Sequence, residues 1–175
     1  MTLRRILRFL RRDDGAATVE IVLLFPLIMW PFFMAMESGM MQMRRVMFER
    51  AVDVVARDIR LGDPTLQSFD AIRAAVCDET LVIPNCLSDL YLEMYPVPVA
   101  NFAAPTESTK CRDRAEDVQP ALTVRPGGRN ELMMMRFCVL YDPILPGAGV
   151  GAQMDVNTGG RGVAMIAETF FVNEP

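Results

Sequence analysis

The sequence predicts an α+β protein: a long N-terminal helix, membrane-spanning and then amphipathic, is followed by a small antiparallel-sheet domain with disulfides. Three observations support this. An almost uncharged apolar run lies near the N-terminus, helical spacing of apolar residues continues beyond it, and the cysteines and extended segments come later. We expect a cytoplasmic basic leader over 1–15, the helix over 16–61 and an exported α+β domain over 62–175.

The apolar run is long enough to cross a membrane. Residues 21–36 carry no charge, and Glu37 alone interrupts the run up to Met43; about 20 such residues span a bilayer as a helix. Pro26 and Pro31 are tolerated in membrane helices. Five arginines precede the run and two follow it, which predicts a cytoplasmic N-terminus. A cleaved secretory signal has a shorter apolar core, about 7–15 residues, so a retained single-pass anchor is favoured.

Helical periodicity continues past the apolar run. From Phe48 to Ile59, apolar residues recur three or four positions apart and form one stripe. Gly62 then predicts the end of this helix. The sequence therefore predicts one helix over 16–61, with a second, shorter helix around 68–78.

Three later segments are extended. Residues 90–102 contain prolines that suit an edge strand or no strand. Residues 131–143 are apolar on both alternating faces, as in a buried strand, and residues 162–172 are similarly rich in β-formers. The Gly-rich loop between them contains Asp155-x-Asn-x-Gly-Gly, the opening spacing of a calcium loop. Ile166 stands where that loop needs an acid, so a plain turn is expected and no metal site is assigned.

All four cysteines follow the apolar run, on the predicted exported side, which favours two disulfides. They are Cys77, Cys86, Cys111 and Cys138. Three connectivities are possible. Cys77–Cys86 is favoured because it closes a short loop, which leaves Cys111–Cys138. A four-thiolate zinc site needs cysteines two to four residues apart, which this spacing does not offer; buried free cysteines are the remaining alternative.

Composition bears on the function. Residues 1–15 contain five arginines and two aspartates, a net +3, whereas residues 16–175 hold 13 basic and 20 acidic side chains, a net −7. An acidic body with no basic stripe argues against nucleic-acid binding. The chain has no histidine, which removes the commonest general base and metal ligand, and it carries no phosphate-loop or nucleophile-elbow motif. We assign no catalytic residue and no cofactor, and expect a protein that is not an enzyme.

Two carboxylates interrupt the apolar region. Glu20 lies inside it, where a charge is costly unless paired; alternatively it sits at the headgroup level, eight residues beyond Arg12. Glu37 is 17 residues further on, roughly 25 Å along a helix. It is therefore expected at the outer interface, in contact with water.

The opening stretch RRDDGAATVEIVLLFPLIM resembles the leader of type IV prepilins, with Gly15, the small Ala16 and Glu20 in register. With AMESGMMQMRR and the C-terminal FFVNEP, the chain more closely resembles the TadE-like minor pilins, or pseudopilins, of bacterial tight-adherence (Flp/Tad) pili. The resemblance is strongest over residues 10–60. Flp-type leaders often have a tyrosine directly after the glutamate; Ile21 stands there, which favours an accessory subunit over the major pilin.

This resemblance implies cleavage by a prepilin peptidase between Gly15 and Ala16, which makes Glu20 the fifth residue of the mature chain. Because a membrane carboxylate is costly unless paired, we expect Glu20 to act as a charge for assembly, paired to the freed amine of Ala16 on a neighbouring subunit or on its own chain. It implies a bacterial inner-membrane location with a periplasmic C-terminal domain, with or without incorporation into an extracellular pilus. The expected partners are the peptidase, other pilus subunits, inner-membrane pilus assembly proteins and the membrane. The alternative is a single-pass anchored exported binding protein with no filament role.

Overall fold

The computed structural model of the protein describes residues 16–99, 111, 112, 114, 123–125, 127–145, 149–153 and 162–174. The elements, in chain order, are α2 (Ala16–Arg60), α3 (Phe69–Glu79), α4 (Cys86–Asp89), β1 (Tyr91–Pro96), β2 (Thr123–Val124), β3 (Leu132–Tyr141), η2 (Val150–Gln153) and β4 (Val163–Val172). Gly15 and the predicted turn around Asp155 lie outside the described residues.

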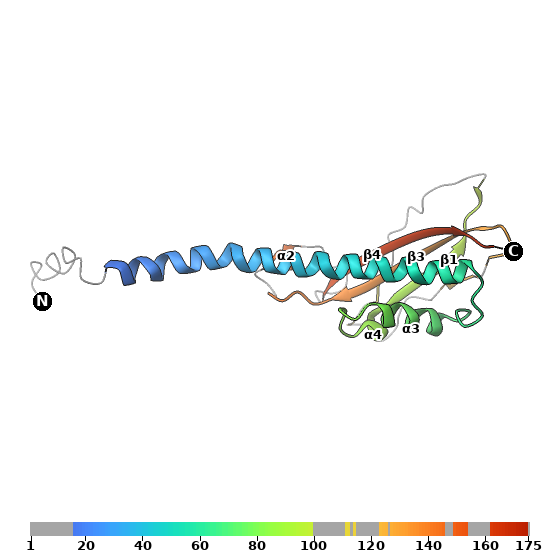
Figure 1. The fold of residues 1–175 in the computed structure, drawn as a ribbon, viewed down its shortest axis with the longest axis horizontal. Coiled ribbons are helices and arrows are strands. Elements are labelled where there is room, and N and C mark those ends of the chain that lie inside the picture. The colour runs from blue at the N-terminus through green and yellow to red at the C-terminus, as the bar shows by residue number, and fades with distance from the viewer. Residues whose placement is uncertain are drawn as a thin grey trace, which may run out of the picture.

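Helix α2 runs along most of the molecule (Figure 1). Its first half stands clear of the other elements, and its second half lies along the sheet, with α3 and α4 to one side. The helix continues through Pro26 and Pro31 for 45 residues. It ends before Gly62, whose φ of +79° suits a residue without a Cβ atom. The predicted helix over 16–61 is therefore confirmed to within one residue.

The apolar stripe on the second half of α2 forms one side of the core. Phe48, Val52 and Val55 are at most 2% exposed, and they belong to the same buried cluster as side chains of α3, β1, β3 and β4. The predicted amphipathic character of this half of the helix is confirmed, and burial of such a face supplies most of the stability of a helix in a folded protein.

Four strands form one sheet in the order β2-β1-β3-β4. β3 pairs antiparallel with both β1 and β4, while β1 and the two-residue β2 are parallel. The α+β prediction with an antiparallel sheet is confirmed. The prediction of an edge position for residues 90–102 is wrong: β1 lies between β2 and β3. Pro96 is tolerated because the pairing of β1 with β2 covers only Glu93 and Met94, so the strand is at the edge of the sheet where the proline lies.

Strand β3 is buried on both faces. Met135, Phe137 and Val139 belong to the core cluster shared with α2, and the alternate residues Cys138 and Leu140 are also 0% exposed. The prediction of a strand apolar and buried on both sides is confirmed.

A row of charges crosses the sheet on the face of β3 that carries Cys138 and Leu140. Arg136 of β3 is 7% exposed, and its Nε donates to Glu168 of β4 at 2.8 Å. Glu93 of β1 lies 4.0 Å from the same guanidinium. Because these residues are also register partners, the charge row reinforces the strand alignment.

Helix α3 covers the range expected for the second helix to within one residue at each end. The Ser68 hydroxyl caps the helix by accepting from the Ala71 N–H at 3.2 Å, and Ile72 and Val76 are buried. The predicted second helix is confirmed. Helix α4, only four residues long, follows Asn85 in the left-handed conformation and was not predicted.

Both disulfides form with the favoured connectivity. Cys77 at the end of α3 is bonded to Cys86 at the start of α4, with 5.6 Å between their Cα atoms. Cys111 is bonded to Cys138 of β3, with a Cα–Cα distance of 5.3 Å. The two bonds fasten α4 and the segment around Cys111 to the rest of the domain.

Protein isolated without reductant is expected to show no reactive thiols, because all four cysteines are bonded. Labelling with a maleimide in denaturant, followed by mass measurement, checks this. A reduced sample is the control and should take up four labels. Four labels on never-reduced protein would contradict the disulfides and weaken the argument for an exported domain.

Candidate functional site

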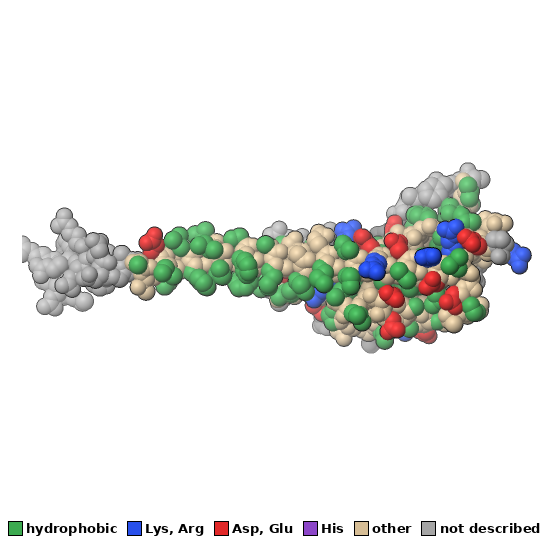
Figure 2. All heavy atoms as spheres, in the orientation of Figure 1, with side chains coloured by type: hydrophobic (Ala, Val, Ile, Leu, Met, Phe, Trp, Pro, Cys, Tyr) green, Lys and Arg blue, Asp and Glu red, His purple; other side chains and the backbone are tan. Residues whose placement is uncertain are grey.

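The exposed half of α2 is the first candidate. From Ala17 to Met36 its side chains are exposed, apart from the half-buried Met29 and Met34. Leu27 is 72% exposed and Trp30 56%. Figure 2 shows hydrophobic side chains over the visible face of this part of the helix up to where the domain begins. Within the part of the chain that the structure describes, this is the one helix long and apolar enough to cross a membrane.

The structure places Glu20 on this exposed half, four residues after the helix begins at Ala16. Its side chain is exposed. Among the residues that the structure describes, none forms a hydrogen bond or ion pair with the Glu20 carboxylate. The pairing of this carboxylate with the amine freed at Ala16 remains a prediction.

Glu37 lies where the exposed half of α2 meets the domain, and the prediction of a water-exposed carboxylate is wrong. The side chain is 1% exposed. One oxygen accepts the Leu145 N–H at 2.9 Å and the other accepts the Val150 N–H at 2.7 Å. The chain after β3 folds back over the helix at this point, so backbone donors replace the water that the sequence suggested.

The close approach at Glu37 depends on a glycine. A Cβ atom added at Gly149 would collide with the Glu37 carboxylate, so a larger residue there would force the loop away from the helix. We refer to the described residues of this segment, 143–145 and 149–153, as the capping loop.

Tyr141 and Arg44 extend the contacts around Glu37. The Arg44 guanidinium lies 5.1 Å from the centroid of the Tyr141 ring, a cation–π contact. The Tyr141 hydroxyl is buried without a hydrogen-bond partner among the described residues. Burial raises the pKa of Tyr141, as does the nearby charge of Glu37, while Arg44 lowers it.

Tyr141→Phe is expected to be neutral or slightly stabilising at pH 7, because it removes a buried hydroxyl that makes no hydrogen bond. The folded pKa of Tyr141 lies above the unfolded value of about 10. The stability associated with the neutral Tyr141 side chain is therefore fully present below a pH of about 10, and it is lost as the pH rises through the folded pKa of Tyr141. Denaturant unfolding at pH 7 and at several pH values above 10 should show a shallower alkaline loss of stability in the variant.

Tyr95→Phe is the matched control for this substitution. It also removes a tyrosine hydroxyl, but one that makes a hydrogen bond, to the Met134 sulfur at 3.4 Å. Some alkaline loss should remain in Tyr141→Phe, since burial also raises the pKa of Tyr91. An identical alkaline curve for wild type and Tyr141→Phe would show that Tyr141 ionises as freely as in the unfolded chain.

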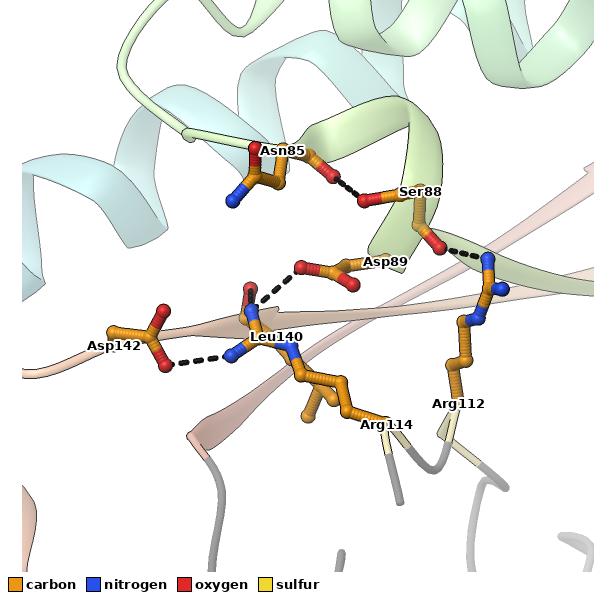
Figure 3. A network of polar contacts seen from close by, with 7 residues as sticks. All are labelled: Asn85, Ser88, Asp89, Arg112, Arg114, Leu140 and Asp142. Carbon is orange, nitrogen blue, oxygen red and sulfur yellow. Dashed lines mark hydrogen bonds and ion pairs between the residues drawn. The ribbon is translucent and has the colours of Figure 1, made fainter. Parts of the chain in front are cut away.

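A second polar cluster joins α4 to the end of β3 (Figure 3). Arg114 donates to Asp89 at 2.5 Å and to Asp142 at 2.6 Å. Asp89 is only 5% exposed. The hydrogen bond to Asp89 is the main reason that the pKa of Arg114 is raised. Arg112 also donates to the Ser88 carbonyl, so this cluster fixes the segment next to the Cys111 disulfide.

A cavity of about 390 Å³ lies at the other end of α2. Its lining includes the apolar side chains of Ile59, Met94 and Met133. Two of its charged lining residues, Arg60 and Glu174, pair with each other at 2.8 Å. Among the described residues no group of three or more cysteine or acidic side chains is arranged to hold a metal ion.

Comparison with known proteins adds no relative: the chain matches no protein-family model, no curated protein and no solved structure. The candidate site around Glu37 is therefore defined by the geometry of this chain alone. The structure brings Glu37 together with the capping loop, which sequence reasoning missed. The available signal was the cost of a carboxylate in an apolar run, which calls for a partner; nothing in the sequence points to donors 108 and 113 residues away.

Proposed function

We propose that this protein is a membrane-anchored minor pilin, or pseudopilin, that is processed by a prepilin peptidase and acts in the assembly or priming of a tight-adherence pilus. One observation carries the proposal. An apolar helix half, exposed along its length and with Glu20 near its start, projects from a disulfide-bonded domain. A helix of this kind serves both as a membrane anchor and as a surface for packing against other subunits.

The proposed location is the bacterial inner membrane, with the N-terminus in the cytoplasm and the domain in the periplasm. The arginine excess before the apolar run supports this orientation. The two disulfides also support it, since such bonds persist in oxidising compartments.

A structural role, as opposed to an enzymatic one, is supported by the buried charges. Glu37, Asp89 and Arg136 are the charged residues buried in the described part of the chain. Each is engaged by a backbone N–H or an opposite charge. Pairing offsets the cost of burying these charges, whereas a catalytic group needs access to a substrate.

Gly15→Leu and Glu20→Ala are expected to fail at different steps. Leucine before the cleaved bond blocks close approach of the peptidase backbone, so Gly15→Leu should retain the leader. Glu20→Ala should be cleaved normally but should associate less with other pilus subunits, because the assembly charge is gone. Intact mass after co-expression with the cognate peptidase measures the first effect, and co-purification with pilus subunits measures the second.

Glu49→Ala is the matched control for Glu20→Ala. Glu49 is an exposed carboxylate on the same helix, paired to Arg45 in the domain half, so its loss should change neither cleavage nor association. A chain that keeps residues 1–15 in cells with normal pili would rule out the prepilin proposal and favour the anchored binding protein.

A further inference from the structure

The length of α2 between Ala16 and Glu37 is about the thickness of the hydrocarbon core of a membrane. These residues are 21 positions apart on one continuous helix, roughly 32 Å. The hydrocarbon core of a bilayer is about 30 Å thick. The capping loop bonds to Glu37 itself, so the domain begins where the hydrocarbon ends.

We propose that the capping loop lies in the headgroup layer of the leaflet on the domain's side, so that the domain rests on the lipid. The inference builds on the proposed membrane anchoring of α2 and names the part of the domain that touches the bilayer. The partner it commits to is a phospholipid surface.

The burial of Glu37 fits this depth. A carboxylate at the edge of the hydrocarbon is poorly hydrated, and irregular backbone there needs its N–H groups bonded within the protein. The Glu37 carboxylate and the N–H groups of Leu145 and Val150 satisfy one another. The side chain is 1% exposed, so neither the charge nor these two donors face the lipid.

Near Glu37, exposed apolar side chains are followed along the helix by arginines, which is the order expected where hydrocarbon gives way to lipid headgroups. Ile144, next to the bonded Leu145, is 43% exposed. On the helix, Met40 and Met43 are 37% and 50% exposed beyond Glu37. Arg44 and Arg45 follow directly. Apolar side chains that give way to arginines within about two helical turns place the cations level with lipid phosphates.

The single tryptophan of the chain, Trp30, allows a direct test. The full-length protein is reconstituted into phosphatidylcholine vesicles whose acyl chains carry bromine, a contact quencher of tryptophan. Trp30 lies seven residues before Glu37, so quenching of the wild type by deep bromines tests the anchor itself. In a Trp30→Phe background, Ile144→Trp then reports on the capping loop.

Leu61→Trp in the same background is the matched control. Leu61 is 61% exposed and lies 24 residues beyond Glu37 at the far end of α2, roughly 36 Å away. Both substitutions fall on exposed side chains, so the fold should tolerate them, and circular dichroism of each variant checks this.

The expected result is several-fold stronger quenching of Ile144→Trp than of Leu61→Trp, with shallow bromines more effective than deep ones. Quenching of Trp30 with no quenching of Ile144→Trp would keep the anchor but overturn the inference, because the domain would then stand clear of the lipid. A blue-shifted but unquenched Ile144→Trp would also overturn it, since protein would then cover the loop. Absence of quenching at Trp30 would defeat the membrane anchor and the inference together.

Discussion

Val139→Asp and Leu140→Asp are each expected to unfold the domain. The two residues are adjacent on β3, point to opposite faces of the sheet, and are both 0% exposed. Either substitution buries a carboxylate with no partner, at a cost of several kcal/mol. Because a whole domain is stable by only about 5–15 kcal/mol, both variants should lose their resistance to protease and their cooperative unfolding transition.

Ile166→Asp provides the control for these substitutions. Ile166 is the register partner of Cys138 on β4, yet it is 40% exposed, so a charge there can remain in water. Its expected cost is well below that of the β3 variants. Equal protease resistance of all three variants and wild type would show that β3 does not have the two-sided burial described above.

Glu37→Ala is expected to release the capping loop. The substitution leaves the N–H groups of Leu145 and Val150 without an acceptor, and each buried unsatisfied donor costs about 1–3 kcal/mol. Opening of the loop relieves that cost, so the amides should exchange with solvent faster. A combined change of about 3 kcal/mol corresponds to roughly a hundred-fold faster exchange at these two amides, measurable by hydrogen–deuterium exchange.

Glu37→Gln should give an intermediate result, because its single amide oxygen accepts one N–H while its NH₂ group faces the other donor. Glu49→Ala controls for removing a carboxylate from α2. Glu49 is exposed and pairs with Arg45, so its loss should change the free energy of unfolding by about 0.5 kcal/mol or less. Unaltered exchange at Leu145 and Val150 in Glu37→Ala would mean that other contacts hold the loop.

Local patterns in the sequence account for much of the fold. The apolar stripe from Phe48 onward and the stop at Gly62 predict the extent of α2, because helix periodicity and chain termination are properties of neighbouring residues. The second helix expected around residues 68–78 matches α3 for the same reason. The length and two-sided apolar pattern of residues 131–143 predict β3 and its burial.

The remaining features depend on contacts between distant residues. Glu37 is buried because a loop more than 100 positions away returns to it, which no local pattern encodes. Prolines at the end of β1 suggested an edge strand, but the pairing with β2 is settled by tertiary contacts. Helix α4 is too short for a periodic signal and is held by the Cys77–Cys86 bond and the Asp89–Arg114 pair.

Helix α2 is continuous, so its two halves are expected to move together as one rigid rod. In the described structure the same helix enters the proposed membrane span and the core of the domain without a linker, so the domain has no hinge about which to reorient. Membrane helices tilt by about 20° on average. The 23 residues from Glu37 to Arg60 span roughly 35 Å. With Glu37 as the pivot, such a tilt would move the far end of the domain sideways by roughly 12 Å. If α2 spans a bilayer as proposed, a change in its packing there would therefore displace the domain.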